Sequence, residues 1–249
     1  MSDGERARGL VRGLLRPGAR RRLRRALAWP PVGAVELGSL RRTTPISANY
    51  GFDRGTPIDR YYIERFLRSH TADIRGRVLE IGDDDYTYRF GGSRVDRSDV
   101  LDAARDNPKA TIVADIAHAP EIESNTFNCI ICTQVLLLVY DVRAAIATLE
   151  RILAPGGVLL LTVPGVSRIC RPEADTWGDW WRFTTMSLRR LLEERFPASD
   201  LEVEAYGNVL TATAMLHGLA AEELGGGELS ANDPDFEVTV AARAEKLPW

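Results

Sequence analysis

The feature that most constrains the fold of this chain is a series of short apolar segments separated by helical or loop segments. The clearest of them, residues 158–163, is almost entirely apolar and is therefore predicted to be a strand buried on both faces. Four shorter strands are predicted before it, at residues 77–82, 94–98, 111–114 and 129–133. Strands that alternate with helices or loops in this way predict an α/β protein with a mostly parallel sheet and covered faces.

Capping residues and apolar periodicity mark the expected helices. Thr56 is expected to cap a helix that has Pro57 in its first turn, and Asp141 to cap a helix over residues 142–153. The first of these helices has one apolar stripe: Ile58, Tyr62, Ile63, Phe66 and Leu67. Later in the chain, helices are predicted at residues 186–196 and 209–224, and strands at residues 201–206 and 236–244. The two late strands predict an antiparallel addition at one edge of the sheet.

Charge is distributed unevenly along the 249 residues. Residues 1–30 hold nine Arg and two acidic residues, a formal charge of +7, so the remainder carries −10 within the total of −3. We therefore expect a basic N-terminal extension over residues 1–45 and one globular domain over residues 46–249. An acidic domain argues against a broad nucleic-acid surface.

The extension has three open interpretations. Leu10, Val11, Leu14 and Leu15 share one helical face, and five Arg follow between residues 20 and 25. These features suit a mobile or loosely docked tail, an interfacial helix drawn to anionic lipid, or a contact with a partner protein or RNA.

Composition also indicates a compartment. The chain has neither the run of about 20 apolar residues that spans a bilayer nor the apolar core of a signal peptide. Three Cys, an odd number, fit a reducing cytoplasm, with peripheral contact on the inner membrane face as an option. Cys129 and Cys132 should point to opposite faces of a buried strand, so we expect two buried thiols and no metal site.

Polar residues follow the first, second, third and fourth predicted strands. In an open parallel sheet, ligands bind beyond the carboxyl ends of the strands, where the strand order reverses. The residues at those ends are Glu80, Gly82, Asp96 or Asp99, Asp115 and Gln134. A carboxylate after the second strand suits a ribose diol, and one after the third can accept a hydrogen bond from an adenine amine.

The turn after the first strand narrows the choice of ligand. Gly82 is followed by three carboxylates, Asp83, Asp84 and Asp85, and the later glycines of a dinucleotide-binding loop are missing. Three carboxylates would repel a pyrophosphate but would tolerate a nucleoside that carries an ammonium and a sulfonium. The turn thus favours S-adenosylmethionine over NAD, although the same residues could simply cap a solvated turn.

Several motifs resemble class I S-adenosylmethionine-dependent methyltransferases. Residues 78–82 (Val-Leu-Glu-Ile-Gly) resemble the first motif of this class, and residues 127–136 and 149–164 resemble later ones. The similarity is closest to the small-molecule branch often called type 11. Residues 51–62 and 177–184 also look like a bacterial subgroup found with polysaccharide-building enzymes. The resemblance implies a Rossmann-like seven-stranded sheet and S-adenosyl-L-methionine as the cofactor.

The resemblance implies roles for single residues. Glu80 and Gly82, with Asp83 beside them, should line the methionine part of the cofactor. Asp99 corresponds to the acid that holds the ribose hydroxyls, with Asp96 as the alternative.

The resemblance also covers the third and fourth strands. Asp115 and Ile116 correspond to the pair beside adenine, and Gln134 lies where the fourth strand opens onto the cofactor. Three features depart from the family. They are the acidic turn, a span of only eleven residues between Gly82 and Arg94, and Leu138 where the branch often has His.

The acceptor is expected to bind near residues 168–184, after the fifth strand. Aromatic residues beside charges suit a sugar or another polar ring, although the segment could also be a lid folded on its own aromatic cluster. The predicted acceptor-binding residues are Tyr61, Trp177, Trp181 and Arg182, and Asp179 is the candidate general base.

The predicted function is methyl transfer from S-adenosylmethionine to a small-molecule or glycan-type acceptor, at oxygen. One alternative is a protein of the same fold that has lost activity and serves in glycan assembly. A second is a nicotinamide-dependent oxidoreductase.

Overall fold

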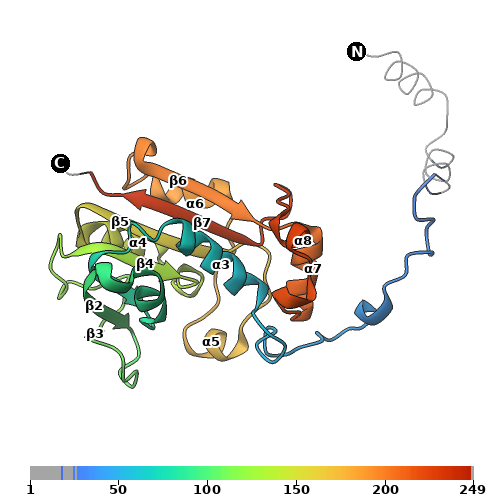
Figure 1. Ribbon diagram of the computed structural model, residues 1–249, viewed down its shortest axis with the longest axis horizontal. Helices are drawn as coiled ribbons and strands as arrows, with labels where there is room; N and C mark the ends of the chain where they lie inside the picture. Colours follow the sequence, from blue (N-terminus) through green and yellow to red (C-terminus); the bar gives the residue numbers. More distant parts are fainter. Residues whose placement is uncertain (1–17, 19–24, 26, 248–249) are drawn as a thin grey trace, which may run out of the picture. The chain divides into compact units, whose positions relative to one another are not determined.

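The computed structural model describes residue 18, residue 25 and residues 27–247, and the chain divides into two compact units at residues 1–44 and 45–249 (Figure 1). The described part of the first unit includes the short helix η1 (Gly38–Leu40). The helical face expected at Leu10–Leu15 lies outside the described residues. No helix in the described part of the chain is both long and apolar enough to cross a membrane.

The second unit is built on a seven-stranded sheet of order β3-β2-β1-β4-β5-β7-β6 (Figure 1). The strands are β1 (Gly76–Ile81), β2 (Val95–Asp102), β3 (Ile112–Val113), β4 (Phe127–Thr133), β5 (Leu153–Pro164), β6 (Leu201–Tyr206) and β7 (Thr239–Glu245). The pairings among β1 to β5 are parallel, which confirms the predicted mostly parallel sheet. The antiparallel strand β7 lies inside the sheet, between β5 and the edge strand β6.

Several strand boundaries differ from the prediction, and β5 begins at Leu153, five residues before its predicted start. β2 continues to Asp102, four residues beyond the predicted end, because the buried residues Val100 and Leu101 pair with Glu80 and Ile81 of β1. The first half of this strand is charged and has no apolar pattern, so the sequence pattern did not predict that its second half continues as a buried strand. β3 is reduced to two residues.

The helices are largely where periodicity predicted them. The longer ones are α3 (Ile58–Ser69), α4 (Val142–Ile152), α6 (Thr185–Leu192) and α7 (Val209–His217), and the short ones are η4 (Leu136–Leu138), α5 (Arg171–Thr176), η5 (Ala198–Asp200), η6 (Ala221–Glu223) and α8 (Gly226–Ser230). The Asp141 carboxylate accepts from Ala144 N at 3.0 Å, so the predicted cap of α4 is confirmed. The predicted Thr56 cap of α3 is wrong, because the Thr56 hydroxyl instead donates to Glu222 at 2.7 Å.

Two apolar clusters cover the two faces of the sheet. Helices α4 and α6 pack on one face, and α3 and α7 pack on the other. Alternation along each strand divides the side chains between these clusters, as expected for parallel strands covered on both faces. Cys129 and Cys132 are fully buried in opposite clusters, and burial raises the pKa of each thiol.

The connection from β1 to β2 contains no full α-helix, as its length predicted. It forms a single π-helical turn, η2 (Thr87–Gly91), followed by the 3-10 turn η3 (Gly92–Arg94). Tyr86 and Phe90 anchor this connection in the same cluster as α3. The short connection leaves the carboxyl end of β1 open for a ligand.

Candidate functional site

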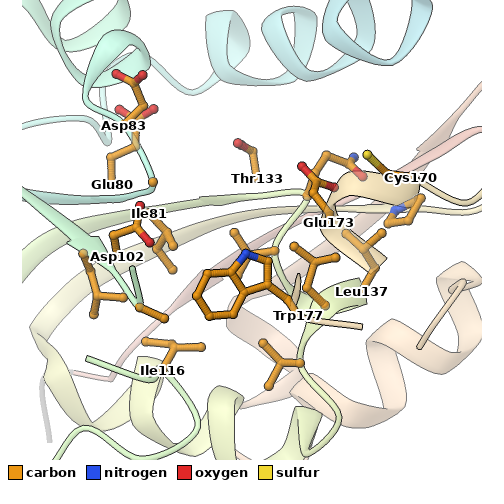
Figure 2. Close-up of a pocket in the computed structure, with 18 of the residues that line it drawn as sticks. Glu80, Ile81, Asp83, Asp102, Ile116, Thr133, Leu137, Cys170, Glu173 and Trp177 are labelled. Atoms are coloured by element: carbon orange, nitrogen blue, oxygen red, sulfur yellow. The ribbon is translucent and has the colours of Figure 1, made fainter. Parts of the chain in front are cut away.

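A large pocket lies beyond the carboxyl ends of β1 to β5, at the switch in strand order between β1 and β4 (Figure 2). Its volume of about 1860 Å³ is larger than the roughly 300–1,000 Å³ of common small-molecule sites. A ligand of nucleoside size would therefore leave room for a second molecule.

The end of β1 contributes Glu80 and Gly82 to the pocket wall, where they were predicted. The buried Glu80 carboxylate accepts from Thr87 N at 2.7 Å and from the Thr87 hydroxyl at 2.8 Å, which holds the turn against β1. Burial raises the pKa of Glu80 to about 7. Gly82 has a φ of 85°, and a Cβ built there would meet no atom within 4 Å, so space is open above this residue.

The acidic turn that follows is partly neutralised by a lysine. Lys109 Nζ lies 2.6 Å from a carboxylate oxygen of Asp83 and 3.0 Å from oxygens of Asp84 and Asp85. Burial opposes ionisation of Asp83, but Lys109 outweighs it and lowers the pKa of Asp83 to about 2. Asp83 and Asp85 line the pocket, so an excess of negative charge remains at this end.

Asp99, the predicted ribose ligand, does not line the pocket. It pairs with Leu79 in the middle of the sheet, and its buried carboxylate lies 2.7 Å from Arg77 Nε and 3.0 Å from Arg97 Nη2. Burial would raise the pKa of Asp99, but the two guanidinium groups hold it below its usual range. Asp99 is therefore a structural ion-pair partner. The alternative, Asp96, is exposed near the opposite end of β2.

The acid that the second strand does present to the pocket is Asp102, at the end of β2. Its carboxylate accepts from Ala104 N at 2.8 Å and from Asn107 Nδ2 at 2.6 Å. The same Asn107 amide donates to Gly82 O at 2.8 Å and so joins the two strand-end turns. The apolar pair Val100-Leu101 is the sequence signal that could have located this strand end.

The third and fourth strands bring the remaining predicted cofactor residues to the pocket. Asp115 is exposed and accepts from Ala117 N at 2.9 Å, whereas Ile116 is buried. Gln134 has the left-handed backbone conformation, with a φ of 56°. Its Nε2 is buried and has no hydrogen-bond partner among the described residues. All three residues line the same pocket as Asp102.

The predicted base Asp179 does not line the pocket. Its side chain is 2% exposed, pairs with Arg182, and accepts from Cys170 N at 3.2 Å. Arg182 lowers the pKa of Asp179 and also donates to Arg168 O at 2.8 Å. The two residues pair with each other and join the two ends of the segment 168–182. Neither the predicted role of Asp179 as general base nor the predicted role of Arg182 in binding the acceptor fits this arrangement.

The aromatic residues of this segment separate into different positions. Trp177 and Trp180 line the pocket. Trp181 lies outside it and donates from Nε1 to Val139 O at 3.1 Å. Tyr140 packs edge-on against Trp180, with a distance of 5.1 Å between ring centroids.

Helix α3 presents Arg60, rather than Tyr61, to the pocket. Tyr61 packs against Tyr62 within the apolar cluster, because successive helical residues face directions about 100° apart. The Arg60 guanidinium donates to the Tyr86 hydroxyl at 2.9 Å, and Asp59 lies beside it on the pocket wall. Burial raises the pKa of Asp59. Neither Arg60 nor Asp59 was predicted from the sequence to line the site.

None of the three His lines the pocket. The arrangement defines an α/β protein with a large ligand site at the strand switch point, bordered by carboxylates at the ends of β1, β2 and β3. Residues 50–205 match the family described as "Methyltransferase domain". That match covers more than half of the chain, so this protein belongs to the methyltransferase domain family. The cofactor of its class is S-adenosylmethionine.

Solved structures share the fold at low sequence identity. A SAM-dependent methyltransferase from Archaeoglobus fulgidus is 13% identical, with a TM-score of 0.53 over 80% of this chain and 100% of that chain. The [4+2]-cyclase SpnF is 16% identical, with a TM-score of 0.50 over 78% and 84% of the two chains. The N-methyltransferase NodS from Bradyrhizobium japonicum WM9, in complex with S-adenosyl-L-homocysteine, is 20% identical with a TM-score of 0.49 over 84% and 96%. No curated protein matches the chain.

Proposed function

We propose that the protein transfers the methyl group of S-adenosylmethionine to a hydroxyl group of a small-molecule or glycan-type acceptor. The observation that carries this proposal is the pocket at the switch point, where Asp102 and Asp115 follow adjacent strands and the turn after β1 is acidic rather than rich in glycine. A phosphate-free, cationic cofactor suits that charge, whereas the pyrophosphate of NAD does not.

The strand ends fit the nucleoside part of the cofactor. Asp102, held by Asn107, would accept hydrogen bonds from the ribose diol, a role moved here from Asp99. Asp115 would accept from the adenine amine, and buried Ile116 would pack on the ring. The buried Nε2 of Gln134, which lacks a partner among the described residues, supports a polar ligand beside β4.

The methionine part fits the other end of the site. Open space above Gly82 accommodates a ligand close to the backbone. Arg60 would bind the methionine carboxylate, and Asp83 would face its ammonium group. When bound, the cofactor supplies an electrophilic methyl group on a sulfonium.

The acceptor would occupy the remaining volume, between β4, β5 and α5. Methyl transfer needs alignment and exclusion of water more than covalent help. Figure 2 shows the Glu173 carboxylate directed into the pocket on the side of Thr133. Glu173 would accept the proton of an acceptor hydroxyl, the role that Asp179 is too firmly paired to perform.

Isothermal calorimetry and a transfer assay test the proposed function. We expect S-adenosylhomocysteine to bind and NAD not to bind. Labelled S-adenosylmethionine should then methylate hydroxyl-bearing sugars or related small molecules. Binding of NAD without S-adenosylhomocysteine would contradict the proposal, and so would methyl transfer exclusively to amines.

The N-terminal extension supports a separate proposal about location. Its nine Arg within residues 1–30 suit anionic lipid at a cytoplasmic membrane face. In the described part of the extension, Leu27 is 75% exposed and Trp29 is 89% exposed, so both side chains are available to insert at an interface.

A further inference from the structure

Trp177 is a large apolar side chain that lies uncovered inside the pocket. It is 44% exposed, although it lines the pocket together with buried Ile116 and Leu137. Figure 2 shows its indole projecting into the pocket, with the six-membered ring directed toward the side formed by Asp102 and Ile116. An aromatic surface of this size at a strand-end site indicates a ligand that covers it.

The backbone that carries this indole is held by hydrogen bonds. Trp177 caps the carboxyl end of α5, where its N–H donates to Glu173 O at 2.7 Å. The next residue, Gly178, has a φ of 91°, and a Cβ there would lie 2.3 Å from the Trp180 indole. Trp180 N donates to Leu137 O at 2.8 Å, which ties the end of the segment to η4.

The two ends of the segment 168–182 are joined as well. The Asp179–Arg182 pair connects its two ends through Cys170 N and Arg168 O. The indole is therefore carried by a closed loop that is attached at both ends.

We infer that Trp177 belongs to the cofactor site and stacks on the purine ring of the bound nucleoside, opposite Ile116. This inference rests on the proposed function, because it takes the ligand beyond β2 and β3 to be an adenosine. The carboxylates Asp102 and Asp115 flank the same part of the pocket and would fix the ribose and the exocyclic amine. Aromatic Trp177 and aliphatic Ile116, which both line this pocket, are the kinds of side chain that pack against a purine.

This assignment gives the segment around α5 a role in binding the cofactor in addition to the acceptor. Trp177 was predicted to bind the acceptor, but its indole is directed toward the side of the pocket formed by Asp102 and Ile116. The segment after β5 would then cover the nucleoside as well as border the acceptor.

Calorimetry with S-adenosylhomocysteine tests the inference without knowledge of the acceptor. We expect Trp177→Ala to weaken binding about tenfold, in line with the loss of one base–aromatic stack. Trp177→Phe keeps an aromatic face and should restore most of the affinity. Trp181→Ala is the matched control, because that neighbouring indole lies outside the pocket and should leave affinity unchanged. Thermal unfolding of each variant separates weaker binding from loss of folding.

Tryptophan fluorescence gives a second measurement. Stacking on a purine should quench part of the emission of the wild-type protein, and Trp177→Phe should remove that change while Trp181→Phe retains it. If wild type binds S-adenosylhomocysteine but folded Trp177→Ala binds it equally well, the inference is wrong and the proposed function stands. If wild type does not bind it at all, both are wrong.

Discussion

Asp99 and Asp102 lie three residues apart on β2 and have opposite surroundings. Asp99 is buried between two Arg in the middle of the sheet, whereas Asp102 stands at the strand end beside open pocket. An acid satisfied by two ion pairs stabilises the fold, and an acid with free lone pairs at a strand end can bind a ligand. Whether a carboxylate on β2 forms ion pairs or can bind a ligand therefore depends on its position along the strand.

Asp102→Ala should weaken S-adenosylhomocysteine binding by about 1–3 kcal/mol, through loss of charged hydrogen bonds to the ribose. Calorimetry measures the change. Asp99→Asn provides the matched control. It should lower the free energy of unfolding, because it breaks a buried ion-pair cluster, but leave affinity close to wild type. The reverse pattern would return the ribose role to Asp99.

Glu80 should make the stability of the protein depend on pH. Burial raises the pKa of Glu80 from its ordinary value of 4.5 to about 7, so the folded state holds a proton that the unfolded state has lost in this pH range. The free energy of unfolding should therefore fall as pH rises from about 4.5 to about 7 and then level off. Glu80→Gln cannot ionise and should lack this fall. Urea unfolding between about pH 5 and 8 measures the difference, and parallel curves would refute the assignment.

At the scale of elements, the segment after β5 shows how one ion pair organises a loop. The Asp179–Arg182 pair closes residues 168–182 on themselves, and α5 carries Glu173 and Trp177 into the pocket. Neither residue of the pair lines the pocket, so its effect on a ligand must pass through its neighbours, which include α5 and the lining residues Arg168 and Cys170.

Asp179→Asn should loosen this segment without affecting the sheet. We expect amide hydrogen exchange over residues 171–178 to quicken about tenfold or more, from the loss of charge-assisted hydrogen bonds, while β4 amides keep their protection. Asp175→Asn, an exposed change in the same segment, is the control. Unaltered exchange in Asp179→Asn would show that the ion pair does not hold α5.

Local pattern predicted the elements of the domain well and the partners of its charged residues poorly. The Asp141 cap, the opposed thiols of Cys129 and Cys132 and the short β1–β2 connection follow from spacing within a few residues. The partners of Asp99 come in part from β1, and those of Asp179 from the folded loop. Such pairings depend on register and loop closure, which spacing along the chain does not specify.

At the scale of the whole molecule, the basic charge and the folded domain lie in different parts of the chain. The match to the methyltransferase domain family, residues 50–205, lies entirely within the second unit, and the Arg-rich residues precede that unit. Each juxtamembrane Lys or Arg contributes about 1 kcal/mol of attraction to an anionic bilayer, and salt screens this attraction.

The full chain should therefore bind vesicles of mixed phosphatidylcholine and phosphatidylglycerol, and dissociate as salt is added. Co-sedimentation measures this binding. A chain of residues 45–249 should remain in the supernatant, and so should the full chain with pure phosphatidylcholine. Equal binding by both chains would show that the extension is not the lipid contact.

Lys109 has a practical consequence for detecting ligands. It and Lys246 are the only lysines in the chain, and Lys246 donates to Asn125 and to the Glu150 carbonyl. Lys109 is held by three carboxylates, which raise its pKa and make its amine a poor nucleophile. A ligand that draws Asp83 away from this cluster would release the amine. Acylation of Lys109, followed by peptide mass spectrometry, would then report occupancy of the site in the unmodified protein.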